Sequence, residues 1–216
     1  MAENVERVFN NIADAGGSPE SVQLIAVTKG FGPEMVAAAH AAGLVDLGES
    51  YVQEFEAKRI DASVQAIEPG LRWHFIGRLQ TNKVRSLADV DVELIHSVDR
   101  TSLVKELAKR KPGQRVLIQV NIGEEEQKGG CSFDDVDGLV ARARDSGLAV
   151  AGLMGVARLA DDDDTRRQFD HLVAVADRHE LVIRSIGMSG DLGIAVRAGS
   201  NMIRVGTAIF GPRPPR

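Results

Sequence analysis

Residues 22–49 have the sequence VQLIAVTKGFGPEMVAAAHAAGLVDLGE. Its two apolar runs, at 22–29 and 44–49, predict two β-strands, because nearly continuous apolar runs are typical of parallel strands that helices cover. The segment between them predicts a helix, with Pro33 near its start and Gly43 at its end. The whole unit therefore predicts a strand–helix–strand crossover of an α/β protein.

The same alternation of strand and helix patterns continues to the end of the chain. Further strands are predicted at 72–77, 93–98, 115–122, 149–156, 181–188 and 202–210. Eight such units predict a single-domain (β/α)8 TIM barrel over residues 1–216. An extra N-terminal helix is expected at 2–15, where it covers the position of a missing eighth helix. The strand pattern leaves an open doubly wound sheet as the alternative fold.

The composition is that of an ordinary globular protein, with 44% hydrophobic and 26% charged residues. The net charge of -5 argues against general nucleic-acid binding, which needs a concentrated positive surface, but it is compatible with a small basic pocket. The N-terminus has no apolar signal-peptide region, and no uncharged apolar run approaches the roughly 20 residues of a membrane span. The single cysteine, Cys131, excludes an intrachain disulfide and fits a reducing compartment. We therefore expect a cytoplasmic protein with no nucleic-acid or membrane partner.

Lys29 is the sharpest candidate for chemistry. It follows the apolar run LIAVT at the C-terminal end of the first predicted strand, where a parallel barrel gathers its reactive groups. A partly desolvated lysine keeps more of its amine neutral, and the neutral amine is the form that attacks an aldehyde. The alternative is a lysine that simply reaches solvent.

A candidate anion site follows from the last two strand ends. The segment MSGD at 188–191 offers backbone N–H groups and the Ser189 hydroxyl, and GTAIFG at 206–211 adds Gly206 and Thr207. The loops after strands seven and eight are the usual phosphate site of this barrel. The alternative interpretation is that these are ordinary turn and strand residues.

Arg204 is expected to point into the barrel. Strand alternation places Met202, Arg204 and Gly206 on one face, opposite Ile203 and Val205. A buried guanidinium needs an acceptor. An unprotonated pyridine nitrogen is one such acceptor, and a salt bridge to a carboxylate such as that of Glu49 is the other.

Seven separated segments of the sequence resemble the YggS/PROSC family of pyridoxal 5′-phosphate (PLP) homeostasis proteins, which are related to the N-terminal barrel of alanine racemase. They are LIAVTK (24–29), GESYVQE (48–54), WHFIGRLQTNK (73–83), VLIQVNI (116–122), GLMGV (152–156), GMSGD (187–191) and GSNMIRVGTAIFG (199–211). The segments occur in the family's order over nearly the whole chain. The resemblance implies a barrel of the alanine racemase N-terminal type.

The resemblance also implies a cofactor site. Lys29 would carry PLP as a covalent aldimine, and Arg204 would face the pyridine nitrogen and so weaken the ring as an electron sink. Ser50 stands where the family usually has Asn, and the tail at 211–216 is expected not to touch the site. The full set of cofactor-binding residues implied is Lys29, Ser50, Met188, Ser189, Arg204, Gly206 and Thr207.

The family's function is the buffering and carriage of PLP, with an influence on amino-acid and keto-acid metabolism and little or no turnover. The resemblance therefore implies a non-enzyme, expected to be a monomer, that makes transient contact with PLP-dependent apoenzymes. One alternative is a PLP-dependent amino-acid racemase, but that reaction needs a second base. The only tyrosine in the sequence is Tyr51, and we expect no further domain of the kind that supplies this base in alanine racemase. The other alternative is a phosphate-binding barrel enzyme that acts on a sugar phosphate.

Overall fold

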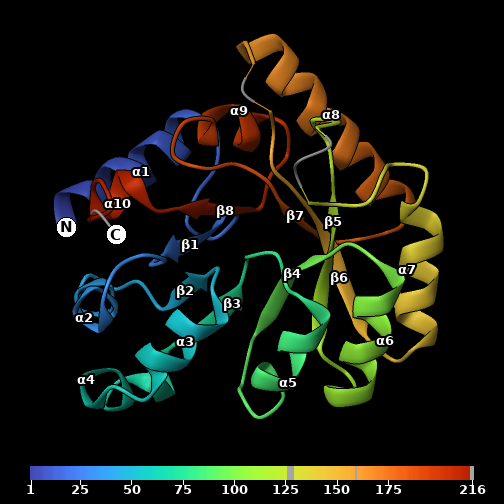
Figure 1. Ribbon diagram of the computed structural model, residues 1–216. Helices are drawn as coiled ribbons and strands as arrows, with labels where there is room; N and C mark the ends of the chain where they lie inside the picture. The colour runs from blue at the N-terminus through green and yellow to red at the C-terminus, as the bar shows by residue number, and fades with distance from the viewer. Residues whose placement is uncertain (126–128, 159, 215–216) are drawn as a thin grey trace.

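The computed structural model describes residues 1–125, 129–158 and 160–214, and its strands form one closed parallel barrel in sequence order (Figure 1). The last strand pairs with the first, with Ile25 opposite Arg204. This closure confirms the predicted barrel and excludes the open sheet. The strands are β1 (Gln23–Val27), β2 (Asp46–Glu49), β3 (Arg72–Phe75), β4 (Leu94–Val98), β5 (Arg115–Val120), β6 (Ala149–Gly155), β7 (Ile183–Ser185) and β8 (Met202–Val205).

Helices surround the barrel and bury their apolar faces against it (Figure 1). On the helix after β4, for example, Leu103, Val104 and Leu107 recur at helical spacing and are fully buried. The longer helices are α2 (Pro33–Ala41), α3 (Val52–Arg59), α6 (Thr101–Arg110), α7 (Val136–Asp145), α8 (Asp162–Arg178) and α9 (Leu192–Arg197). The shorter ones are α4 (Ala62–Gln65), α5 (Val84–Leu87), α10 (Thr207–Phe210) and the 3-10 turns η1 (Glu68–Gly70) and η2 (Thr81–Lys83). No helix in the described part of the chain is long and apolar enough to cross a bilayer.

The N-terminal helix α1 (Ala2–Asp14) closes the outer layer. It packs against α9 and α10, beside the last strand, and its Val5, Val8 and Ile12 are buried there (Figure 1). The Asn4 side-chain amide also donates a hydrogen bond of 2.9 Å to the Ile209 carbonyl. The expected role of this helix as a substitute for an eighth barrel helix is confirmed.

The predicted strand at 202–210 is wrong in its second half. β8 ends at Val205, and the chain then turns at Gly206 into the short helix α10. The N–H groups of Ile209 and Phe210 both bond to the Gly206 carbonyl, at 2.9 Å each. Because the chain leaves the sheet at this point, Ile209 is buried in the outer apolar layer. The apolar residues of this segment are compatible with a short buried helix as well as with a strand.

The apolar core has two parts. The larger part fills the space between the strands and the helices. The smaller part lies inside the barrel and consists of Ile25, Leu94, Leu117, Met154 and Met202. Polar side chains share that interior, since His74, His96, Ser185 and Arg204 are also buried. A barrel interior is usually filled by apolar layers, so these buried polar side chains are a departure from the usual interior of this fold.

Candidate functional site

Lys29 stands just beyond the C-terminal end of β1, where the chain leaves the barrel. The buried Thr28 before it is fixed on both sides: its hydroxyl donates to Glu49 Oε1 at 2.6 Å, and its carbonyl accepts from Lys58 Nζ at 2.7 Å. Lys58 also pairs with the buried Glu49. These contacts hold the backbone from which the half-buried Lys29 side chain extends.

The surroundings of Lys29 favour its neutral amine. Burial lowers its pKa, and the positive charges of Arg213 and Arg204 lower it further, against the opposing carboxylates of Glu49 and Glu54. A larger share of the amine is therefore unprotonated near neutral pH than in a solvent-exposed lysine. The amine is poised to attack a carbonyl carbon.

Lys29 lines a small cavity of about 260 Å³ at the C-terminal mouth of the barrel. Its walls are partly apolar, with contributions from Phe31, Ile76 and Met154. The cavity brings together Lys29, Met188, Ser189, Arg204, Gly206 and Thr207. Ser50 instead lines a neighbouring hollow of about 880 Å³, whose wall also includes Lys29.

The loops after β7 and β8 offer free hydrogen-bond donors to this cavity. Within the described segments, the backbone N–H groups of Ser189, Gly190, Gly206 and Thr207 donate to no protein acceptor. The Ser189 hydroxyl lies 3.3 Å from the N–H of Ala208, which joins the two loops. Free backbone N–H groups on residues that line one cavity suit a phosphate, so this part of the cavity fits an anionic group.

Arg204 also lines this cavity and is held by uncharged acceptors. Its Nη1 donates to the carbonyl and hydroxyl oxygens of Ser185, both at 2.7 Å, and its Nη2 donates to the Gly155 carbonyl at 3.0 Å. The alternative prediction, a salt bridge from Arg204 to Glu49, is wrong. The Glu49 carboxylate forms its ion pair with Lys58 instead. A guanidinium has five N–H bonds, so Arg204 retains donors for an acceptor in the cavity, such as a ring nitrogen.

The buried position of Arg204 changes the pKa of its guanidinium. Burial lowers its pKa to about 10, and the nearby Asp191 carboxylate opposes this shift. The guanidinium nevertheless stays protonated at neutral pH. Arg204 therefore acts as a hydrogen-bond donor at neutral pH and does not give up its proton.

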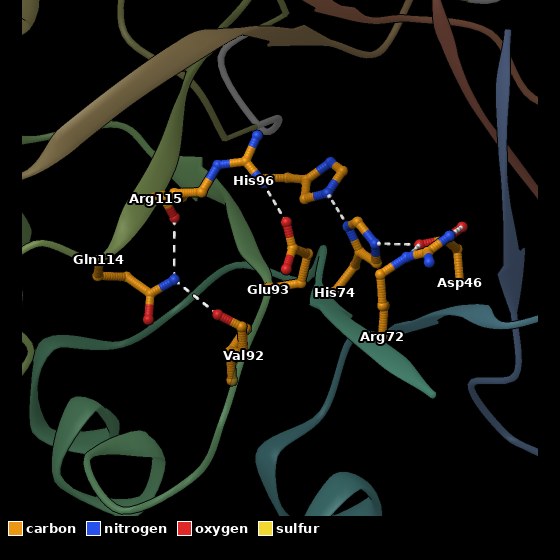
Figure 2. A network of polar contacts seen from close by, with 8 residues as sticks. All are labelled: Asp46, Arg72, His74, Val92, Glu93, His96, Gln114 and Arg115. Atoms are coloured by element: carbon orange, nitrogen blue, oxygen red, sulfur yellow. Dashed lines mark hydrogen bonds and ion pairs between the residues drawn. The ribbon is translucent and has the colours of Figure 1, made fainter. Parts of the chain in front are cut away.

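A line of buried hydrogen bonds continues from Arg204 through the barrel. The Ser185 hydroxyl lies 3.1 Å from His96 Nδ1, His96 Nε2 lies 3.0 Å from His74 Nδ1, and His74 Nε2 lies 3.1 Å from Asp46 Oδ1. Asp46 then accepts two bonds, at 2.7 and 2.6 Å, from the half-exposed Arg72 at the start of β3. Figure 2 shows the far end of this line, from His96 through His74 to Asp46 and Arg72. The line joins the cavity to the opposite, N-terminal end of the barrel.

The two ends of the line set its direction. Arg204 can only donate, while Asp46 is an acceptor: burial raises the pKa of its carboxyl, but bonds from His74 and Arg72 outweigh that effect and bring it to about 2. Burial also lowers the pKa of His96 well below its ordinary value, helped by the charges of His74 and Arg204. Every link is satisfied if the Ser185 hydroxyl donates to His96 Nδ1, His96 Nε2–H donates to His74 Nδ1, and His74 Nε2–H donates to Asp46. His74 is thus a buried core histidine with both ring nitrogens bonded.

Arg213 is a site residue that sequence reasoning missed. It lines the small cavity, and its Cδ would lie 3.1 Å from a Cβ at Gly30, the residue after Lys29. The expectation that the tail at 211–216 does not touch the site is therefore wrong for Arg213, while residues 215–216 lie outside the described part. Arg213 lies just after the short helix α10, which ends at Phe210.

Two other kinds of site find no support. Cys131 is buried, and burial raises the pKa of its thiol to about 12, so it is not a reactive nucleophile. In the portion of the chain that the structure describes, no three His, Cys, Asp or Glu side chains are grouped as metal ligands. The chemistry of the molecule is therefore concentrated at the barrel mouth around Lys29.

The sequence profile of the family described as "Alanine racemase, N-terminal domain" matches residues 2–214. A pyridoxal phosphate homeostasis protein of Vibrio alginolyticus is 36% identical over 99% of this chain and 97% of its own length. One of the same name from Aquifex aeolicus is also 36% identical, over 99% of this chain and 96% of its own.

Solved structures agree with the sequence relatives. PipY of Synechococcus elongatus with PLP bound has a TM-score of 0.81 and 30% identity, covering 97% of this chain and 99% of its own. The alanine racemase of Corynebacterium glutamicum has a TM-score of 0.72 at 17% identity, covering 99% of this chain and 62% of its own, and so shares the fold. The likeness thus extends over the whole barrel.

Proposed function

The chain belongs to the alanine racemase N-terminal domain family and, within it, to the pyridoxal phosphate homeostasis proteins, and from this premise we propose that it holds PLP on Lys29 and buffers the supply of that cofactor. PLP is the group that PipY binds in its solved structure. On this proposal the protein is a cytoplasmic monomer that contacts PLP-dependent apoenzymes transiently.

One observation carries the proposal: a single cavity presents three chemically distinct groups that match three parts of PLP. The amine of Lys29, whose pKa is lowered by burial, suits the aldehyde, and the free N–H groups of Ser189, Gly206 and Thr207 suit the phosphate. The remaining donors of Arg204 suit the pyridine nitrogen. Met188 adds an apolar wall.

Bound PLP supplies an electrophilic carbon and, when its ring nitrogen is protonated, an electron sink. In this chain Arg204 would donate toward that nitrogen and, with a pKa near 10, would not protonate it. The ring would then act as a weaker electron sink. Lys29 would hold the aldehyde carbon, and the loops after β7 and β8 would hold the phosphate. This arrangement favours retention of the cofactor over turnover, in keeping with relatives that are named homeostasis proteins.

Absorbance spectroscopy tests the proposal. Purified protein mixed with PLP should develop the near-visible band of a Schiff base, and Lys29→Ala should lose that band while keeping its fold. Borohydride reduction followed by peptide mass spectrometry should place a pyridoxyl group on Lys29. Lys105→Ala, an exposed change on α6, is the matched control and should keep the band. A reduced pyridoxyl group on another lysine, or a band that survives Lys29→Ala, would refute the assignment.

A further inference from the structure

The hollow of about 880 Å³ beside Lys29 is larger than the cavity assigned to the cofactor. The start of α3 forms one wall, and the segment between β3 and α5 forms the other. Gly77 allows that segment to pass close to Ser50, because a Cβ at Gly77 would lie 2.0 Å from the Ser50 carbonyl oxygen. Because Lys29 lines both spaces, an occupant of the hollow lies next to the atom of PLP that Lys29 binds.

The hollow is positively charged in a chain whose net charge is -5. Lys29, Arg78, Lys83 and Arg100 line it, and no Asp or Glu of the described segments does. Arg100 is already committed, since it pairs with Asp99 at 2.5 Å and donates to the Leu79 carbonyl at 2.7 Å. Arg78 and Lys83, by contrast, have no ion-pair partner among the described side chains. Two uncompensated cations thus face a space that a small molecule can enter.

The two spaces offer different donors to an anion. A guanidinium matches the paired oxygens of a carboxylate or a phosphate, and an ammonium adds a point charge. The side chain of Asn82 supplies a further polar group. The free backbone N–H groups that suit a phosphate lie around the smaller cavity instead. The hollow therefore presents side-chain cations to a second anion, separate from the backbone donors of the smaller cavity.

We propose that the hollow binds the carboxylate of a small amino acid or 2-keto acid, with Arg78 and Lys83 as its contacts, next to PLP on Lys29. The neighbouring cofactor rests on the proposed function, whereas the carboxylate site itself rests on the charges and shape of the hollow. The site makes the PLP store responsive to the metabolites that PLP enzymes interconvert.

Isothermal titration calorimetry on the PLP-loaded protein tests the proposal, with L-alanine, pyruvate and inorganic phosphate as separate probes. At least one of the two carboxylates should bind, and it should bind more tightly than phosphate. Lys83→Met and Arg78→Met should each weaken that binding by about tenfold or more, because each removes a charge-assisted contact. Lys105→Met, which removes an exposed lysine elsewhere on the surface, should leave it unchanged.

Heat from alanine alone, or from pyruvate alone, supports the proposal and identifies the source of the carboxylate. Unchanged affinity in both Lys83→Met and Arg78→Met, tighter binding of phosphate, or no heat from either carboxylate would overturn it. The absorbance band separates the two hypotheses. If the band forms but the carboxylates give no heat, the hollow is misassigned and the cofactor site stands; if the band fails to form, the cofactor proposal fails on its own.

Discussion

Replacement of Ser185 by alanine should break the buried line at the point where it meets Arg204. The substitution removes one hydroxyl oxygen from a fully buried position and leaves the barrel backbone unchanged. Two contacts disappear: the 2.7 Å bond from Arg204 Nη1 and the 3.1 Å bond to His96 Nδ1. The Arg204 bond to the Ser185 carbonyl remains, so the guanidinium loses only part of its support.

The expected cost follows from the character of these bonds. A hydrogen bond to a charged group contributes about 1.5–3 kcal/mol, and a buried acceptor left unsatisfied costs about 1–3 kcal/mol. The bonded groups touch one another, so the two effects do not simply add. We expect Ser185→Ala to lower the free energy of unfolding by about 3 kcal/mol, which exceeds the cost of most single substitutions.

Urea denaturation of the protein without added cofactor measures this loss. Ser102→Ala, on the exposed face of α6, is the control and should change the free energy of unfolding by less than about 0.5 kcal/mol. A second measurement is the absorbance of bound PLP, which should shift because Arg204 is less firmly held. A Ser185→Ala protein as stable as the control variant would show that the hydroxyl does not connect Arg204 to His96.

Three further predictions concern the titrating groups. Lys58→Met leaves the Glu49 carboxyl buried without its partner and should lower the free energy of unfolding by about 3–5 kcal/mol in urea; a loss below about 1 kcal/mol would contradict the pairing. Because burial lowers the pKa of Lys29, the rate of PLP attachment, followed by stopped-flow absorbance, should rise with pH and level off below pH 10.5, the ordinary lysine value; a rate still rising at that pH would count against a perturbed amine. The pKa of Asp46 is about 2 when folded, below its ordinary 3.8, so its contribution of about 2 kcal/mol is present above the unfolded value and is lost as the pH falls through the folded one. Acid titrations of unfolding should therefore show the advantage of the natural protein over Asp46→Asn shrinking by that amount between pH 5 and pH 2, and a constant difference would refute the link.

The fold was predictable because its signals are local. The apolar runs mark the strands, and the helical patterns between them require parallel crossovers. The position of Lys29 follows from the same rule, since β1 ends just before it. The inward direction of Arg204 follows from alternation along β8, and the structure places it inside the barrel.

The partners of these residues were not predictable, because barrel closure decides them. His96 on β4 meets Ser185 on β7, 89 residues later, across the interior. Glu49 was a reasonable partner for Arg204 by strand position, but Lys58, from α3, reaches it. No local pattern in the sequence shows which of several buried polar groups will meet.

The order in which the site residues leave the ribosome has a consequence for when the cofactor can be acquired. Lys29 is among the first residues synthesised, whereas Arg204, Gly206, Thr207 and Arg213 belong to the last strand and its tail. On the proposed function, a growing chain exposes the Lys29 amine long before the groups proposed to hold the rest of the ligand exist, and domains generally fold as units. Stable capture of the cofactor would then follow translation, and a loaded molecule would be a sign that translation of the barrel has been completed.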